Sequence, residues 1–223
     1  MSYIDTKMHI HLKKLLYEIY LRKPENLFDE FVKECEASYT KPAHTLAELR
    51  QRNNKKIRGD IFEDFCILYL RYIKGYDTVW LLKDVPNDIL YSLSMKRQDM
   101  GIDIIISSPD GFYAVQCKYK KAEKRKTCIS WSALSTFYAL CLRTGPWNKY
   151  IVMTTADYIR HQGPKTEKDL SICSGSLKAI QSEDWLKMCE MNETDVEIPI
   201  QPPIEDIRAK RLAYYENLNK LNL

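Results

Sequence analysis

The chain has 223 residues, of which 45% are hydrophobic and only seven are glycine, and its formal net charge is +4. This length and composition suit one medium-sized globular domain with appendages, or two small domains, and they exclude a largely disordered chain. The small excess of 34 basic over 30 acidic residues does not by itself identify a polyanionic partner.

Seven scattered cysteines include no C-x-x-C pair and no zinc-ligand spacing, so we expect reduced, mostly buried thiols. We interpret His9 and His11 as an incidental surface pair rather than a metal site. The chain has neither a signal-like apolar segment near its start nor an apolar run of the roughly 18 residues that a transmembrane helix needs. We therefore expect a soluble, intracellular protein (cytoplasmic, or nuclear in a eukaryotic or viral setting) that does not contact a membrane.

Residues 1–55 predict a helical N-terminal accessory segment, with helices HLKKLLYEIYLR, ENLFDEFVKECEASY and HTLAELRQRNNKK separated by Pro24 and Pro42. A basic patch follows, made of Arg50, Arg52, Lys55, Lys56 and Arg58. In the next predicted helix, DIFEDFCILYLRYIKG, Asp60 can provide the N-terminal cap and Gly75 marks the end.

Several β-branched or aromatic stretches then predict strands: TVWLL, IDIIIS and FYAVQCKY around an SPDG turn, KYIVMTTA, and the weaker LSICS. Helices are predicted at SWSALSTFYALCLR, which Ser130 can cap, and at SLKAIQSEDWLKMC. The helix at 130–143 forms a crossover that places the strand in the 150s parallel to a neighbouring strand. Residues 56–190 thus predict one α/β domain, and residues 191–223 an acidic, proline-rich linker with a docking helix.

The hairpin in GIDIIISSPDGFYAVQCKYKK predicts which side chains meet. If Pro109 and Asp110 are the central turn residues, the numbers of paired residues sum to 219 and Asp103 lies opposite Gln116. Strand alternation then places Lys118 on the same face. A bulge at Gly111 would instead shift the pairing by one residue and reverse the face.

The preceding helix offers an acidic side chain to this strand face. The residues three, four and seven positions after Glu63 are apolar, whereas Asp64 shares its stripe with Asp60 and Arg71. We therefore expect Glu63 to point inward. The alternative is a capping box, in which Asp60 caps the helix and Glu63 bonds back to the backbone.

Burying these charged groups together is costly unless they pair or bind an ion. Asp103, the side-chain carbonyl of Gln116 and a main-chain carbonyl near Cys117 suit magnesium, which takes few protein ligands and keeps several waters. Lys118 can then assist the attacking water or stabilise negative charge on the phosphate.

Residues 59 to about 180 resemble the Mrr-like branch of the PD-(D/E)XK restriction-endonuclease-like superfamily, and in particular the nuclease modules of helicase-type restriction enzymes. The matching pieces are GDIFEDF, MGIDIII, AVQCKYKK and IVMTT. The resemblance implies a mixed central sheet flanked by helices and a nuclease that uses Mg²⁺, with Mn²⁺ as a substitute. The superfamily's proline is absent, because Gly101 and Ile102 precede Asp103, as is common in this branch.

The resemblance also implies roles for single residues. Asp103 matches the metal-binding acid, Gln116 the position that is acidic in most of the superfamily, and Lys118 the motif lysine. Glu63 matches the acid on the helix before the first core strand. The expected metal ligands are thus Asp103, Gln116, Glu63 and the backbone carbonyl of Cys117, and the expected catalytic residues are Asp103, Gln116, Lys118 and Glu63.

A basic run follows the second hairpin strand, with Lys120, Lys121, Lys124, Arg125 and Lys126 against the single acid Glu123. Alone, such a run is typical of a solvated loop, but beside Lys118 it predicts phosphate contacts that position a duplex. Thr154 and Thr155 either bind backbone phosphate or merely end their strand. Trp131 either stacks on nucleic acid or packs in the core.

We therefore expect a magnesium-dependent DNA endonuclease from a restriction, mobile-element or viral DNA-processing system, acting on duplex DNA. A homodimer, or a helicase or motor domain in the same or a partner polypeptide, would allow both strands to be cut. Two alternatives remain: a nucleic-acid-binding or assembly module that keeps the fold without cutting, and a nuclease directed at RNA.

Overall fold

The computed structural model describes residues 3–37, 54–98, 101–160 and 166–190. The chain divides after Glu190, and the fold below is that of the first unit, Met1–Glu190. The predicted helices in HTLAELRQRNNKK and in the C-terminal segment lie outside the described residues. The helices are α1 (Tyr3–Arg22), α2 (Leu27–Ala37), α4 (Asn54–Leu68), α5 (Asn87–Ser92), α6 (Ser135–Arg143), α7 (Ser174–Lys178) and α8 (Ser182–Cys189). The strands are β1 (Thr78–Leu81), β2 (Ile104–Ser108), β3 (Gly111–Lys118), β4 (Cys128–Ser130), β5 (Lys149–Thr154), β6 (Tyr158–Arg160) and β7 (Asp169–Ile172).

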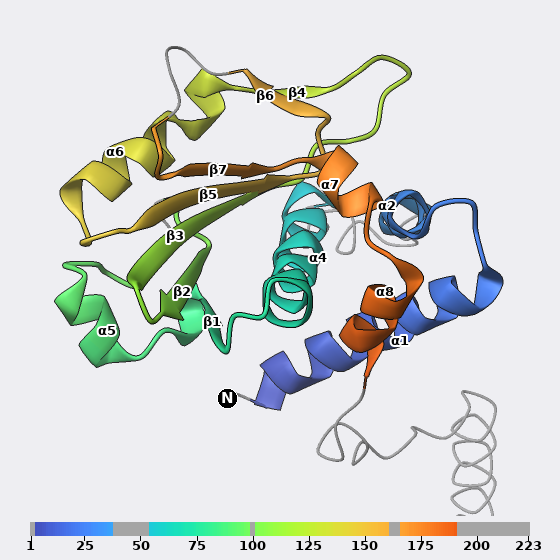
Figure 1. The fold of residues 1–223 in the computed structure, drawn as a ribbon, viewed down its shortest axis with the longest axis horizontal. Helices are drawn as coiled ribbons and strands as arrows, with labels where there is room; N and C mark the ends of the chain where they lie inside the picture. The colour runs from blue at the N-terminus through green and yellow to red at the C-terminus, as the bar shows by residue number, and fades with distance from the viewer. Residues whose placement is uncertain (1–2, 38–53, 99–100, 161–165, 191–223) are drawn as a thin grey trace, which may run out of the picture. The chain divides into compact units, whose positions relative to one another are not determined.

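A five-stranded mixed sheet forms the centre of this unit, in the order β1-β2-β3-β5-β7 (Figure 1). β1, β2 and β3 pair antiparallel, whereas β5 runs parallel to both β3 and β7. The α6 crossover between β3 and β5 makes that parallel pairing possible. The predicted α/β class, with a mixed sheet flanked by helices and an N-terminal helical extension, is therefore confirmed.

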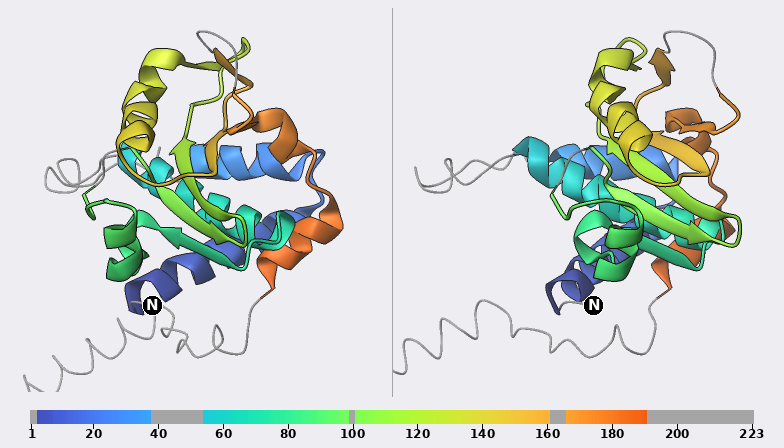
Figure 2. Two further views of the ribbon diagram at one scale, coloured as in Figure 1. Left: turned by 60° about the vertical axis from the view of Figure 1, so that its left-hand side comes forward. Right: turned by 90° about the vertical axis from the view of Figure 1, so that its left-hand side faces the viewer.

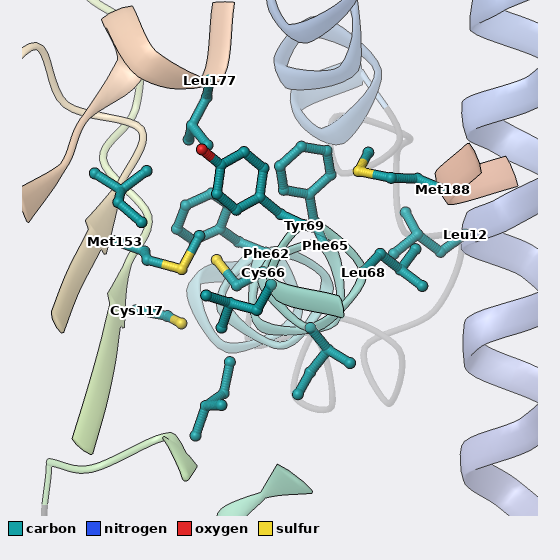
Figure 3. Close-up of a cluster of buried hydrophobic side chains, with 14 of the residues drawn as sticks. Leu12, Phe62, Phe65, Cys66, Leu68, Tyr69, Cys117, Met153, Leu177 and Met188 are labelled. Atoms are coloured by element: carbon teal, nitrogen blue, oxygen red, sulfur yellow. The ribbon is translucent and has the colours of Figure 1, made fainter. Parts of the chain in front are cut away.

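One face of the sheet packs against α4, the helix at the centre of the larger hydrophobic cluster (Figures 1 and 3). α1, α2 and α8 pack around α4 on the side away from the sheet, and all three contribute buried side chains to the same cluster. Phe65 of α4 is fully buried and stacks on Phe31 of α2, with ring centroids 4.7 Å apart. The N-terminal helices, which the sequence suggested were accessory, thus form part of the main core.

The opposite face of the sheet is covered by α5 and α6 (Figures 1 and 2). A second buried cluster there includes Leu93, Phe137 and the sheet residues Ile105, Ala114 and Val152. It also contains one residue each from β4 and β6, which pair parallel as a separate two-stranded sheet. The two clusters assign each sheet residue to a face: Ile104 and Val115 face α4, and Ile105 and Ala114 face α6.

The predicted hairpin register is confirmed, because Ile104 pairs with Val115 and Ser108 pairs with Gly111. Gly111 reaches the turn with φ +128°, and a Cβ there would collide with the Asn148 side chain.

Other local predictions need correction. The helix predicted from Ser130 is a 3₁₀ turn, Trp131–Leu134, followed by α6, and Ser130 makes no side-chain cap. The helix predicted over SLKAIQSEDWLKMC is two helices, α7 and α8, separated by the extended Gln181. Helix α5 and strands β4 and β6 were not predicted.

Candidate active site

Asp103 lies just before β2, where three hydrogen bonds hold it in place. Its amide donates to the carbonyl of Val115 at 2.9 Å, and its carbonyl accepts the Leu82 amide at 2.8 Å. Its carboxylate oxygen Oδ2 accepts the backbone N–H of Cys117 at 2.6 Å. The β2–β3 ladder ends at Ile104, so the Asp103 side chain makes the next contact with β3. The protein alone therefore fixes one oxygen of this carboxylate.

A pocket of about 350 Å³ lies between this carboxylate and helix α4. Asp103 and Glu63 both line it, so the structure brings together these two predicted metal ligands. Its lining is rich in charge of both signs, with the acids Asp60, Glu63, Asp64 and Asp103 and the bases Lys56, Lys83 and Arg97.

Helix α4 departs from the prediction in two ways. It begins at Asn54, so Asp60 lies in the helix interior and the capping-box alternative for Asp60 and Glu63 is excluded. The inference that only Glu63 points inward is wrong as well, because Asp64 is 2% exposed while Glu63 is partly exposed. Elements pack around α4 on several sides, so the helix has no single buried stripe. Asp64 is thus a pocket acid that the periodicity missed.

Gln116 lies on a different face of the sheet from Glu63. It pairs with Val152 of β5, a residue of the cluster under α6, and its side chain is 3% exposed. Its Nε2 atom lies 3.6 Å from the position that a Cβ on Gly101 would occupy. Its Oε1 atom is buried and accepts no hydrogen bond from the residues that the structure describes. The amide oxygen is thus an acceptor in need of a partner.

Lys118 follows Gln116 on the same side of β3, at the end of the strand. Its backbone carbonyl accepts a hydrogen bond from the Thr154 hydroxyl at 2.7 Å, and its side chain is partly exposed. Neither Lys118 nor Gln116 lines the pocket that holds Asp103 and Glu63. Among the described residues, no three His, Cys, Asp or Glu side chains form a group arranged to hold a metal ion.

Two thiols lie behind the pocket, at the contact between α4 and β3. Cys66 and Cys117 are buried and hydrogen-bonded to each other, and Figure 3 shows them beside Met153. Burial raises the pKa of both thiols, and the shift is large for Cys117. Both therefore stay protonated and neutral at physiological pH, as expected for buried cysteines with a packing role.

Two cations at the pocket carried no signal in the sequence. Arg97 donates hydrogen bonds from its guanidinium to the carbonyls of Lys83 and Val85, the latter at 2.8 Å, and to the Asn87 side chain. These bonds fix the Arg97 side chain beside Lys83 at the pocket wall. Lys83 and Arg97 belong to no basic run, so only the tertiary fold identifies them.

The predicted nucleic-acid contacts differ in exposure. Lys121, Lys124, Arg125 and Lys126 are exposed, and Lys120 is partly exposed and lies 4.0 Å from Glu123. Thr154 is fully buried, which excludes direct contact with a phosphate, and the Thr155 hydroxyl is bonded to the backbone of Lys120. Trp131 stacks on Tyr138 at a centroid distance of 4.7 Å and stays partly exposed, so it is not a fully buried core residue.

A mixed five-stranded sheet with an acid before the central hairpin and the Q-x-K sequence on its second strand defines a restriction-endonuclease-like nuclease domain. The family model Mrr_cat_2, described as a restriction endonuclease, matches residues 71–195, more than half of the chain. The chain therefore belongs to this restriction endonuclease family. The match includes Asp103, Gln116 and Lys118 but begins after Glu63. No curated protein and no solved structure matches the chain.

Every helix in the described ranges is too short or too polar to cross a lipid bilayer.

Proposed function

We propose that the protein is a magnesium-dependent endonuclease that hydrolyses phosphodiester bonds in duplex DNA. The observation that carries this proposal is the shared pocket of Asp103 and Glu63, within a member of a restriction endonuclease family. Phosphoryl transfer needs a positioned cation and charge stabilisation more than a covalent catalyst, and a pocket that combines carboxylates with basic side chains suits it.

The donor atoms on this chain fit a hard cation. The carboxylates of Asp103 and Glu63 lie at one pocket, and magnesium is commonly bound by one or two carboxylates together with waters and substrate phosphates. The buried Gln116 Oε1 atom lacks a donor among the described residues, which a nearby cation would compensate. The Cys117 carbonyl would be a further ligand, and Mn²⁺ would substitute for Mg²⁺. The bound cation would polarise the scissile phosphate and lower the pKa of the attacking water.

The chain's own cations would complete the reaction site. Lys118 would assist the attacking water or stabilise the charge that develops on the phosphate, as its place in the Q-x-K sequence suggests. Lys83 and Arg97 line the acid pocket and would hold the phosphate close to the carboxylates. The exposed cations after β3 would contact the DNA backbone without reading its sequence.

Cutting both strands of a duplex requires two such sites. We propose that the protein works as a homodimer or with a helicase or motor domain, in a restriction, mobile-element or viral DNA-processing system. The oligomeric state in the presence of duplex DNA, measured by analytical ultracentrifugation, separates these two arrangements.

The test is a cleavage assay on plasmid and linear duplex DNA, with and without Mg²⁺. Asp103→Asn keeps the shape of the side chain and an oxygen for the Cys117 amide but removes the charge. We expect kcat to fall by about 100-fold to 1,000-fold, a range typical for the loss of one transition-state contact. Asp110→Asn, at the turn end of the same hairpin, is the matched control and should leave cleavage unchanged.

Three results would contradict the proposal. Equal activity of Asp103→Asn and the parent would exclude Asp103 as a metal ligand. Cleavage of RNA but not DNA would assign the site to an RNA-directed nuclease. Binding of duplex, single-stranded and branched DNA with no cleavage in Mg²⁺ or Mn²⁺ would make the protein a non-cutting nucleic-acid-binding module.

A further inference from the structure

We propose that Thr155 and Asp157 are positioning residues that hold both ends of the basic loop, defined as residues 119–127, so that its cations meet the substrate backbone. This inference rests on the proposed function, because it takes duplex DNA as the partner of the loop. It assigns to these residues an indirect role in binding, in place of the direct phosphate contact that the sequence suggested for Thr155.

The first end of the loop is held by Thr155. The ladder between β3 and β5 ends at the pair of Lys118 and Thr154. Beyond it, the Thr155 hydroxyl donates to the carbonyl of Lys120 at 2.8 Å and accepts the amide of the same residue at 2.7 Å. A single side chain therefore satisfies both backbone groups of Lys120 and extends the attachment of β3 past the end of the sheet.

The second end of the loop is held by Asp157. Its Oδ2 atom accepts the Thr127 amide at 2.7 Å and the Thr127 hydroxyl at 3.2 Å, while its own amide donates to the Thr127 carbonyl at 3.1 Å. Its other oxygen accepts the Ser174 hydroxyl at 3.1 Å, which ties the junction to α7. These bonds, above all that from the Thr127 amide, lower the Asp157 pKa, so the carboxylate stays charged at neutral pH.

The middle of the loop carries the charge. Lys121, Lys124, Arg125 and Lys126 are exposed, and none of them makes an ion pair with another residue in the described part of the chain. The single acid of the loop, Glu123, lies near Lys120 instead. On the inner side of the loop, the Ala122 amide and the Tyr119 hydroxyl both bond to Glu36 of α2, at 3.2 and 3.4 Å.

Fixing both ends of a short segment restricts the conformations that it can adopt before binding. Ordering an interface costs conformational entropy at the moment of association, and preorganisation removes part of that cost. Phosphate contacts contribute affinity roughly in proportion to the cations engaged. Two anchors only two residues apart, Thr155 and Asp157, would therefore raise DNA affinity without touching DNA.

The test uses Thr155→Val, which keeps the side-chain volume but removes the hydroxyl, and Asp157→Ala in the full-length protein. Trypsin cuts after the loop's lysines and arginine, so the rate of cutting between residues 119 and 127 measures how well the loop is held. We expect this rate to rise at least several-fold in both variants, with duplex DNA protecting the parent. Thr155→Ser should restore the parent rate.

Binding and kinetics separate positioning from general stability. Without divalent cation, we expect duplex affinity to fall about 5-fold to 20-fold, and the slope of log K against log salt to lose about 0.9 for each phosphate contact given up. In cleavage, KM should rise by a similar factor while kcat stays within about twofold, because the acid pocket is untouched. Thr166→Val and Asp184→Asn, which alter exposed hydrogen bonds elsewhere, are the matched controls and should behave as the parent.

The outcomes are distinct. Unchanged trypsin cutting would overturn the anchoring itself. Faster cutting with unchanged affinity and salt slope would overturn the role in DNA binding, and a fall in kcat with constant KM would reduce both residues to structural ones. A parent that binds DNA but does not cut it refutes the proposed nuclease activity, yet the cutting and binding measurements still decide the anchoring.

Discussion

The acid pocket and the basic loop both adjoin β3, but they are held in place by different forces. Asp103 and Glu63 sit where β2 and α4 meet, and these elements are buried on both sides in hydrophobic clusters. The loop after β3 has its cations in solvent and is fixed mainly by hydrogen bonds from Thr155, Asp157 and Glu36. Chemistry is thus built on the core, and substrate binding on a surface segment.

This difference separates the effects expected of substitutions. The core and the pocket should respond through stability and kcat, because removing a buried group disturbs packing or the reacting atoms. The loop should respond through KM and salt dependence, because each of its cations adds only a screened, additive contact. The following predictions test this separation.

The largest effect should follow from Phe65→Ala in α4. Phe65 is fully buried between Phe31 and Trp185, with ring centroids 4.7 and 5.9 Å away. Removing the ring should lower the free energy of unfolding by about 3–5 kcal/mol, measured by urea denaturation. Tyr91→Ala, at an aromatic residue that is 88% exposed, is the control and should change it by less than about 0.5 kcal/mol. A loss below about 1 kcal/mol for Phe65→Ala would show that α4 is not anchored by this cluster.

The two acids of α4 should differ in their effect on kcat. If Glu63 is the ligand that the family resemblance implies, Glu63→Gln should lower kcat by about 100-fold, equivalent to about 2.7 kcal/mol, and raise the Mg²⁺ concentration needed for half-maximal rate. Asp64→Asn should lower it by less than about tenfold. Both side chains line the pocket, and Asp64 is the more buried. The reverse result would assign the α4 ligand to Asp64 and correct the resemblance.

Gln116 offers a test in which stability and activity move apart. Its Oε1 atom is buried without a donor among the described residues, so Gln116→Leu should leave the free energy of unfolding unchanged or raise it by up to about 1 kcal/mol. The same change should lower metal-dependent kcat by about tenfold or more, whereas Gln116→Glu should retain metal binding, measured by calorimetry. A Gln116→Leu protein as active as the parent would remove Gln116 from the site.

Much of the fold follows from local signals in the sequence. The Pro109-Asp110 turn fixes the hairpin register, and the end of the helix at Gly75 is confirmed by its φ of +71°. The crossover helix predicted the parallel pairing of β3 and β5. The three-residue strands β4 and β6 were missed because so few residues show no alternation.

The site was only partly predictable, for a physical reason. Alternation placed Asp103 and Gln116 on one face, but the ladder ends at Ile104, and the Asp103 carboxylate instead reaches the Cys117 amide. The inward direction of Asp64 depends on α1 and α8, which are distant from it in sequence and pack beside α4. Side chains at element ends and on helices buried on several sides are set by tertiary packing, which periodicity does not encode.

The smallest effect should come from one loop cation. Lys124→Ala removes one exposed charge from the middle of the basic loop, where it makes no ion pair with a described residue. We expect KM for duplex DNA to rise about twofold to fivefold, the salt slope to fall by about 0.9, and kcat to stay constant. Lys187→Ala, on α8 and paired with Asp184, is the control and should change none of the three. A change in kcat would mean that the loop takes part in the chemistry, because a screened phosphate contact far from the reacting atoms acts on binding alone.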